Sequence, residues 1–323
     1  MITQSIEREL SEFEARFVGL LKDEEAPVHL LLQYLSGQEA GRIRPRMVYL
    51  SAGLFGKIGP ETHRMALVVE LLHLASLIHD DVIDHAAERR GMPTTNAVFD
   101  NKIAVLLGDY LLSRVLDCIF RSGLPGVLEL VTQTVSQLTR GEICQLSQRN
   151  NLDLTEEEYM RIVSMKTASL MGTAFRLGAL SAGAAPEQVE SCGMFGDGFG
   201  TLYQIRDDMK DYTDRQGGKG YHNDLREGDV TLPVIYTMGR LCLSDRAGFR
   251  NRYLQIRKDD GQLRSLADTV VQCGALSQTA DFLRRSVKAL LERCSAFPAS
   301  PYRDDLERMV KEALQPETLP QLS

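Results

Sequence analysis

The sequence predicts an all-α fold, organised as a single domain over residues 1–323. Apolar residues recur with a helical period almost throughout, and short alternating strands do not recur. No linker, repeat or low-complexity segment divides the chain. A chain of 323 residues also has ample sequence to bury a large core.

The central helix is expected at residues 62–84, where the chain is apolar nearly all round, as in a buried helix. Further helices are expected at 102–120, 125–148, 155–180, 187–212, 230–241 and 278–295. Thr155 begins one of them with a capping-box pattern, because Glu158 follows three residues later. The segments between these helices are rich in glycine and proline, as at 89–93, 122–125 and 216–220.

The composition is that of an ordinary globular protein, with 43% hydrophobic and 25% charged residues. A net charge of −7 gives no general attraction to nucleic acid, so no nucleic-acid partner is expected. No apolar run approaches about 18 residues, so no membrane span is expected. The N-terminus is charged and lacks the apolar core of a signal peptide. The six cysteines are dispersed without a CxxC pair, which indicates reduced thiols in a cytoplasmic protein.

Two aspartate clusters with the pattern DDxxD carry most of the functional information. Each follows a largely apolar stretch, and their members are Asp80, Asp81 and Asp84, and Asp207, Asp208 and Asp211. The first and last aspartates of each cluster share one helix face, because they are four positions apart. Clustered carboxylates at the end of an apolar helix repel one another unless a cation is present. A hard divalent cation, Mg²⁺ in particular, is therefore predicted.

A second group of residues is cationic. Singly, each is typical of a surface charge or, for the histidine, of a satisfied core residue. Together they suit two diphosphate groups, one held through metal ions and one held directly by guanidinium groups. These residues are Arg42, Arg44, His73, Arg89, Arg90, Lys166 and Lys219.

With these residues the chain resembles the trans-prenyltransferases, the polyprenyl diphosphate synthases of the isoprenoid-synthase fold. The matching segments run in family order over about residues 40–235: RIRP (42–45), HLASLIHDDVID (73–84), RRG (89–91), GDYLL (108–112), GEICQL (141–146), KTASL (166–170), YQIRDDMKDY (203–212) and GKGYHNDLREGDVTLP (218–233). The resemblance implies a bundle of about ten or more helices around a deep central cavity. It also implies a homodimer.

The resemblance further implies the reaction. Up to three Mg²⁺ ions, with Mn²⁺ as a substitute, assist the departure of diphosphate from an allylic substrate such as farnesyl or geranylgeranyl diphosphate. The double bond of isopentenyl diphosphate attacks the resulting allylic cation, and a proton is lost. The product is a long-chain all-trans polyprenyl diphosphate.

The resemblance implies a role for each residue of this chain that matches a family motif. The metal-site acids are Asp80, Asp81, Asp84, Asp207 and Asp211, with Asp208 a weaker candidate. The residues that match the allylic diphosphate site are Arg89, Lys166 and Lys219. Those that match the isopentenyl diphosphate site are Arg44, His73 and Arg90. The polar residues that line the reacting centre are Thr167 and Gln204; with Lys166, Asp80, Asp84 and Asp207 they form the predicted catalytic set.

Two positions depart from the family pattern. Gly41 stands where a lysine commonly binds isopentenyl diphosphate, and Asp229 replaces a lysine that often precedes the VTLP segment (230–233). Loss of one charged contact is expected to weaken isopentenyl diphosphate binding by about 1.5–3 kcal/mol. Another cation such as Arg46 could compensate. We expect these two departures to change the affinity for isopentenyl diphosphate more than the class of reaction.

Product length is expected to depend on the helix face beneath the first cluster. Ala75 and Ser76 are small where short-chain synthases carry an aromatic plug, and Leu72 lies about 12 Å below Asp80. A product of about C30 or longer is therefore favoured, with Leu72 or Phe120 as the floor of the cavity. The small residues could instead serve close helix packing.

Three alternatives remain at this point. The first is a short-chain synthase that makes geranylgeranyl or farnesyl diphosphate. The second is a non-catalytic partner subunit, but such a subunit would be expected to lose aspartates, and this chain keeps all six. The third is a terpene cyclase, which fits less well because two full DDxxD clusters and the arginine motifs favour chain elongation.

Overall fold

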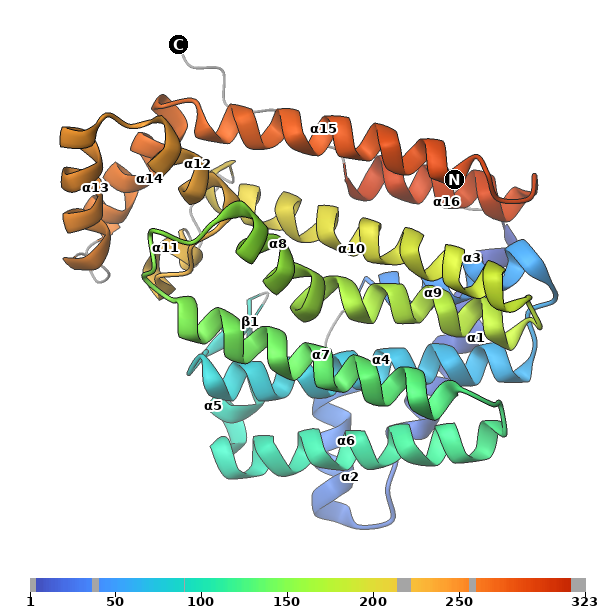
Figure 1. Cartoon of the computed structure of the whole chain (residues 1–323). Helices are drawn as coiled ribbons and strands as arrows, with labels where there is room; N and C mark the ends of the chain where they lie inside the picture. Colours follow the sequence, from blue (N-terminus) through green and yellow to red (C-terminus); the bar gives the residue numbers. More distant parts are fainter. Residues whose placement is uncertain (1–3, 37–40, 90, 214–221, 256–259, 315–323) are drawn as a thin grey trace. The chain divides into compact units, whose positions relative to one another are not determined.

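The computed structural model describes residues 4–36, 41–89, 91–213, 222–255 and 260–314. These residues are mostly helical, and the predicted all-α fold is confirmed (Figure 1). Among them, the strands are β1 (Glu88–Arg89) and β2 (Met92–Pro93), which pair antiparallel. None of the described helices is long and apolar enough to cross a membrane.

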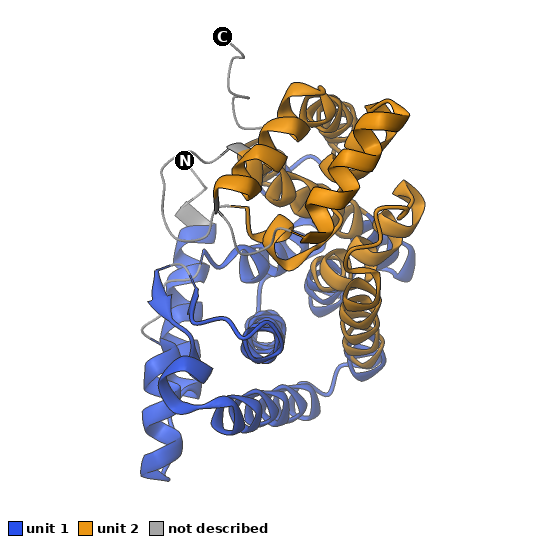
Figure 2. Ribbon diagram, turned by 90° about the vertical axis from the view of Figure 1, so that its left-hand side faces the viewer, with its two compact units in different colours: residues 1–131, 173–194, 298–305 blue, residues 132–172, 195–297, 306–323 orange. Residues whose placement is uncertain are grey.

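The chain forms two compact units, coloured separately in Figure 2. Unit 1 comprises residues 1–131, 173–194 and 298–305, and unit 2 comprises residues 132–172, 195–297 and 306–323. Several helices begin in one unit and end in the other, so the chain passes between the units more than once.

Unit 1 is built around α4 (Pro60–Ile83), which packs against α3 and α6. The residues of α4 from Met65 to Leu72 are all buried, as the apolar stretch predicted. The observed ends of α4 lie within two residues of the prediction. The other helices that lie wholly in this unit are α1 (Gln4–Leu20), α2 (Ala26–Ser36), α3 (Ile43–Phe55), α5 (Thr95–Phe99) and α6 (Asn101–Ser122).

Unit 2 has a separate core, in which α12 packs against α14 and α15. Phe195 and Phe297 meet edge to face within it. The helices that lie wholly in this unit are α8 (Glu156–Val163), α11 (Asn223–Glu227), α12 (Leu232–Arg240), α13 (Leu243–Gln255), α14 (Asp260–Gln272) and α15 (Ala275–Cys294). The helices shared between the units are α7 (Val127–Gln148), α9 (Ser169–Ser181), α10 (Pro186–Thr213) and α16 (Pro301–Ala313).

The helix expected over 155–180 begins as predicted but is not continuous. Thr155 Oγ1 accepts the Glu158 amide at 3.2 Å, and the Glu158 carboxylate accepts the Thr155 amide at 2.9 Å, which confirms the capping box. A π-helical segment, η1 (Ser164–Ala168), then separates α8 from α9. The Ser169 amide donates to the Ser164 carbonyl, five residues back. Such wide turns occur frequently at functional sites.

Candidate active site

The first aspartate cluster ends helix α4. The Asp84 amide donates to the Asp80 carbonyl at 2.8 Å, so the helical hydrogen-bond pattern extends through Asp84. Asp80 and Asp84 therefore lie on one face, one turn apart, as predicted. Both are half-buried, whereas Asp81 is buried.

Asp81 is held by Arg89. The Nε and Nη2 atoms of Arg89 lie 2.8 and 2.7 Å from Asp81 Oδ1. Arg89 belongs to β1, and the turn back to β2 passes through Gly91 at a φ of 76°, where a side chain would be strained. The hairpin thus brings a guanidinium onto the first cluster and offsets one of its three negative charges. Sequence reasoning had assigned Arg89 to a diphosphate rather than to an aspartate.

The residues expected to control product length lie on α4, below the first cluster. Leu72 and Ala75 are buried, and Ser76 is half-buried. The Ser76 hydroxyl donates to the His73 carbonyl at 2.8 Å, so it makes its hydrogen bond within the helix. Phe120 was the alternative floor, but its side chain is 86% exposed at the end of α6, so the chain does not bury it beneath the cluster.

The two arginines of the RIRP segment have different surroundings. Arg42 precedes α3 and bonds Glu14 at 2.6 Å and Glu70 at 2.7 Å while it stacks on two phenylalanines of α1. Arg42 therefore ties α1 to the core of unit 1. Arg44, the predicted substrate ligand, is half-buried in the first turn of α3.

The second aspartate cluster lies in the last turns of α10. Asp207 is exposed, and its carboxylate pairs with Lys210 at 3.3 Å. The Asp211 carboxylate accepts the amides of Asn223 at 2.8 Å and Asp224 at 3.1 Å, so it caps the N-terminus of α11. Asp224 thereby joins the cluster as a further carboxylate that sequence reasoning had not selected.

Asp208 is only 5% exposed and sits in a hydrogen-bonded chain of four side chains. Tyr159 donates to its Oδ2 at 2.6 Å, and Gln204 donates to its Oδ1 at 2.7 Å. Thr167 in turn donates to Gln204 Oε1 at 2.8 Å. Two predicted reaction-centre residues, Thr167 and Gln204, are therefore joined to the second cluster. In the sequence, Tyr159 stands out only as one of the periodic apolar positions of its helix, so its contact with Asp208 was not predicted.

Burial and mutual repulsion raise the pKa values of acids in the second cluster. Burial raises the pKa of Asp208 to about 7, although the hydrogen bonds from Tyr159 and Gln204 oppose the shift. Burial also raises the pKa of Asp211 to about 6, and the negative charge of Asp207 adds to the rise. Burial and the neighbouring carboxylates raise the pKa of Asp224 as well. These crowded carboxylic acids resist ionisation when no cation is present. Such a set of oxygen donors fits a hard divalent ion.

Lys166 and Thr167 are presented by η1, which lies between two glycines. A Cβ on Gly141 of α7 would lie 2.5 Å from the Lys166 amide nitrogen, and one on Gly200 of α10 would lie 2.6 Å from Ala168 Cα. Neither helix could approach η1 so closely with a side chain there. Lys166 Nζ pairs with Glu142 of α7 at 2.6 Å. The glycines and Glu142 position the lysine, a role that the sequence pattern did not reveal.

Within unit 1, the structure describes Arg44, His73, Arg89 and the first cluster. Within unit 2, it describes Lys166, Thr167, Gln204 and the second cluster. The predicted ligands Arg90 and Lys219 lie outside the described residues.

Comparisons with known proteins agree on one family. The family model described as polyprenyl synthetase matches residues 25–270. The chain is 30% identical to the octaprenyl diphosphate synthase of Escherichia coli over 322 residues, which is 97% of this chain and 98% of that protein.

Two solved structures are similar in fold. The decaprenyl diphosphate synthase from Rhodobacter capsulatus superposes with a TM-score of 0.90 at 30% identity, covering 96% of this chain and 97% of that one. A polyprenyl synthase from Caulobacter crescentus, solved with calcium and isoprenyl diphosphate, gives a TM-score of 0.89 at 27% identity, covering 97% of this chain and 96% of that one.

Proposed function

The chain belongs to the polyprenyl synthetase family, and we propose that its two aspartate clusters carry the Mg²⁺-dependent chemistry of a long-chain trans-prenyltransferase. The enzyme condenses isopentenyl diphosphate with an allylic diphosphate and releases diphosphate. The relatives named above are octaprenyl and decaprenyl synthases, which favours a long product over a short-chain synthase. The expected primer is farnesyl or geranylgeranyl diphosphate.

The acids hold the metal ions in this proposal. Asp80, Asp84, Asp207 and Asp211 are direct ligands, whereas Asp208 is held by two neutral donors and acts mainly by position. Up to three Mg²⁺ ions bind, and Mn²⁺ can replace them. When bound by these acids, the ions would supply positive charge to stabilise the departing diphosphate.

The cationic residues divide between the two substrates. Arg89, Lys166 and Lys219 hold the allylic diphosphate, and Arg44, His73 and Arg90 hold isopentenyl diphosphate. Loss of the allylic C–O bond leaves a carbocation, toward which Thr167 and Gln204 present oxygen atoms. The isopentenyl double bond then forms the new C–C bond, and the adjacent carbon loses a proton to restore a double bond.

The acids of the second cluster carry this proposal. The raised pKa values of Asp208 and Asp211 support it, because a divalent cation would stabilise the ionised form of such crowded carboxylates. The Asp81–Arg89 pair is the counterpart in the first cluster, where a guanidinium already offsets one charge.

We also propose that the protein is a homodimer in the cytoplasm. Leu106 (63% exposed), Leu116 and Phe120 lie on one exposed face of α6, and such an apolar stripe suits contact with a second copy. All six cysteines are free, as expected in a reducing compartment.

Incubation with farnesyl diphosphate, labelled isopentenyl diphosphate and Mg²⁺ tests the proposal, with chromatography to measure product length. Asp80→Ala and Asp207→Ala are expected to abolish elongation and to leave the helical circular dichroism unchanged. Asp281→Ala is the matched control, because it removes an exposed helical aspartate outside both clusters. Near-normal turnover in either cluster variant would contradict the metal role.

A further inference from the structure

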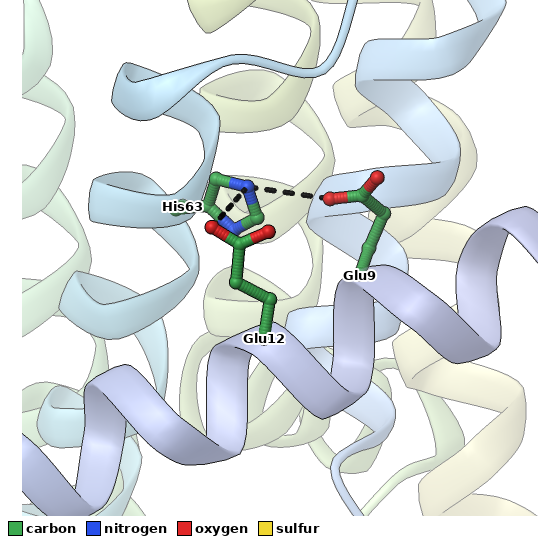
Figure 3. A group of neighbouring side chains, drawn as sticks. All are labelled: Glu9, Glu12 and His63. Atoms are coloured by element: carbon green, nitrogen blue, oxygen red, sulfur yellow. Dashed lines mark ion pairs between the residues drawn. The ribbon is translucent and has the colours of Figure 1, made fainter.

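A second group of metal-ligating side chains lies in unit 1 and shares no residue with the aspartate clusters. It consists of Glu9 and Glu12 of α1 and His63 in the first turn of α4 (Figure 3). The two glutamates are three residues apart, so both project from one face of α1. Helix α1 packs against α4, and this contact places the imidazole opposite the carboxylates.

The three side chains have the spacing of a metal site. His63 Nε2 lies 3.2 Å from Glu9 Oε2 and 3.8 Å from Glu12 Oε1, and all three ligand atoms lie within 4.8 Å of one another. Ligand atoms at about 2.0–2.1 Å from a tetrahedral zinc ion are roughly 3.4 Å apart. The Glu9 oxygen and His63 Nε2 lie close to that separation, and Glu12 Oε1 would have to move closer to His63 to reach it. His63 is only 6% exposed, whereas Glu12 opens to solvent and leaves room for a water ligand.

The other ring nitrogen of His63 has its own partner. Nδ1 lies 2.8 Å from the hydroxyl of Tyr49, a residue that is fully buried. If Nδ1 carries the proton and donates it to the phenol oxygen, the Nε2 lone pair faces the two carboxylates. Histidine ligands of metal ions are usually fixed by such a hydrogen bond on the second nitrogen. In the other tautomer, Tyr49 donates to Nδ1 and Nε2–H donates to Glu9.

The charge of the group also suits a cation. The group brings two carboxylates to one buried imidazole. Arg16 bonds one oxygen of Glu12 at 2.6 Å and offsets one of the two negative charges. The Glu12 oxygen that Arg16 bonds is Oε1, the same atom that faces His63, and the charge of Arg8 also acts on Glu12.

We propose that Glu9, Glu12 and His63 bind a divalent transition-metal ion of the zinc type, with water completing its coordination. One imidazole nitrogen and two carboxylates form a mixed donor set that suits zinc better than magnesium, which prefers oxygen ligands alone. The ion would fasten α1 to the first turn of α4. The site is separate from the Mg²⁺ chemistry and does not depend on it.

Zinc titration of the full-length chain tests the site. The protein is stripped with a chelator and returned to buffer with excess Mg²⁺, which occupies the aspartate clusters, and Zn²⁺ is added in a calorimeter. The wild-type protein is expected to bind one more equivalent of Zn²⁺ than Glu9→Gln or His63→Gln, and its melting temperature is expected to rise with Zn²⁺. Equal stoichiometry and affinity in the wild type and both variants would overturn the proposal.

Two further variants sharpen the result. Tyr49→Phe is expected to weaken Zn²⁺ binding by about tenfold, because it removes the hydrogen bond on Nδ1. Glu61→Gln is the control, since Glu61 lies two residues from His63 but pairs with Arg64, and it should bind Zn²⁺ as the wild type does. If His63→Gln fails to fold, Glu9→Gln and Glu12→Gln decide the question, because both keep the size of the side chain.

Discussion

The hydroxyl of Tyr159 lies 2.6 Å from Oδ2 of Asp208, although the two residues are 49 positions apart in the chain. This buried contact joins α8 to α10 within unit 2. Because Gln204 occupies the other oxygen of Asp208, the carboxylate is fixed in orientation before any ion binds. Asp207 precedes Asp208 and Asp211 follows it on the same helix, α10.

Removal of the Tyr159 hydroxyl should weaken the response to Mg²⁺. Tyr159→Phe leaves a buried acceptor without its donor, which costs about 1–3 kcal/mol. We expect a higher Mg²⁺ concentration for half-maximal activity and a lower kcat, measured by Mg²⁺ titration at saturating substrates. Tyr110→Phe is the matched control, since it removes an equivalent 2.6 Å bond to Asp23 in unit 1. An unchanged Mg²⁺ dependence in Tyr159→Phe would show that this bond does not order the cluster.

In the metal-free protein, the second aspartate cluster should contribute less to stability as the pH rises from about 4.5 to 7, while His63 and His222, whose pKa values burial lowers, act in the opposite direction. Burial raises the pKa of Asp208 to about 7 and that of Asp211 to about 6, above their unfolded value of 3.8. In this window the folded state binds more protons than the unfolded chain, so the free energy of unfolding falls with pH. Mg²⁺ should reverse the trend, because it replaces the lost protons.

Thermal unfolding in chelator at several pH values measures this slope. Asp208→Asn should flatten it, because the amide does not titrate. Acids whose pKa is lowered by a partner, such as Asp153 beside Arg250, act in the opposite direction and only below about pH 4.5. The same slope of melting temperature against pH in Asp208→Asn and in the wild type would contradict the shifts.

A side chain at Gly141 should displace Lys166. In Gly141→Ala, the new Cβ meets the backbone of η1 at 2.5 and 2.8 Å, so the segment has to move. We expect a loss of about 1–3 kcal/mol in the free energy of unfolding and a fall in kcat, measured by urea unfolding and by assay. Gly239→Ala on α12 has nothing within 4 Å and should be neutral or stabilising by up to about 1 kcal/mol. Wild-type kcat in Gly141→Ala would show that the close approach has no role in catalysis.

A large residue at position 76 should shorten the product. Ser76 is half-buried one turn below Asp80, whereas Ala75 is fully buried and would be overpacked by an aromatic ring. In Ser76→Phe, the ring is expected to block the growing chain, and chromatography should show a shorter main product. Ser286→Phe, a half-buried serine on α15, controls for the substitution itself. An unchanged product length would place the path of the chain elsewhere.

The sequence predicted the ranges of α4, α6, α7, α10, α12 and α15 because burial leaves a periodic trace, but it did not single out α1, α2, α3, α5, α11, α13, α14 or α16. Helix α4 lies within two residues of its expected bounds, and the capping box at Thr155 formed as expected. The features that were missed depend on contacts that a helical period does not encode. The pairing of Arg89 with Asp81 needs the hairpin, and the bond from Tyr159 to Asp208 needs two helices side by side. The local sequence pattern contains no information on either of these two contacts.

The break at η1 was also missed, because Ser164–Ala168 has the composition of an ordinary helix. The break changes how far the residues on either side of it are rotated about the helix axis. In a regular α-helix, residues eight apart, such as Tyr159 and Thr167, are rotated by roughly 80° about the axis. A wide turn holds one extra residue, so the pair behaves as if seven apart, which reduces the offset to roughly 20°. Both side chains can then reach the same edge of α10. Deletion of Met165 should remove the wide turn and still keep the pair in phase, because seven residues complete almost two turns of an unbroken helix.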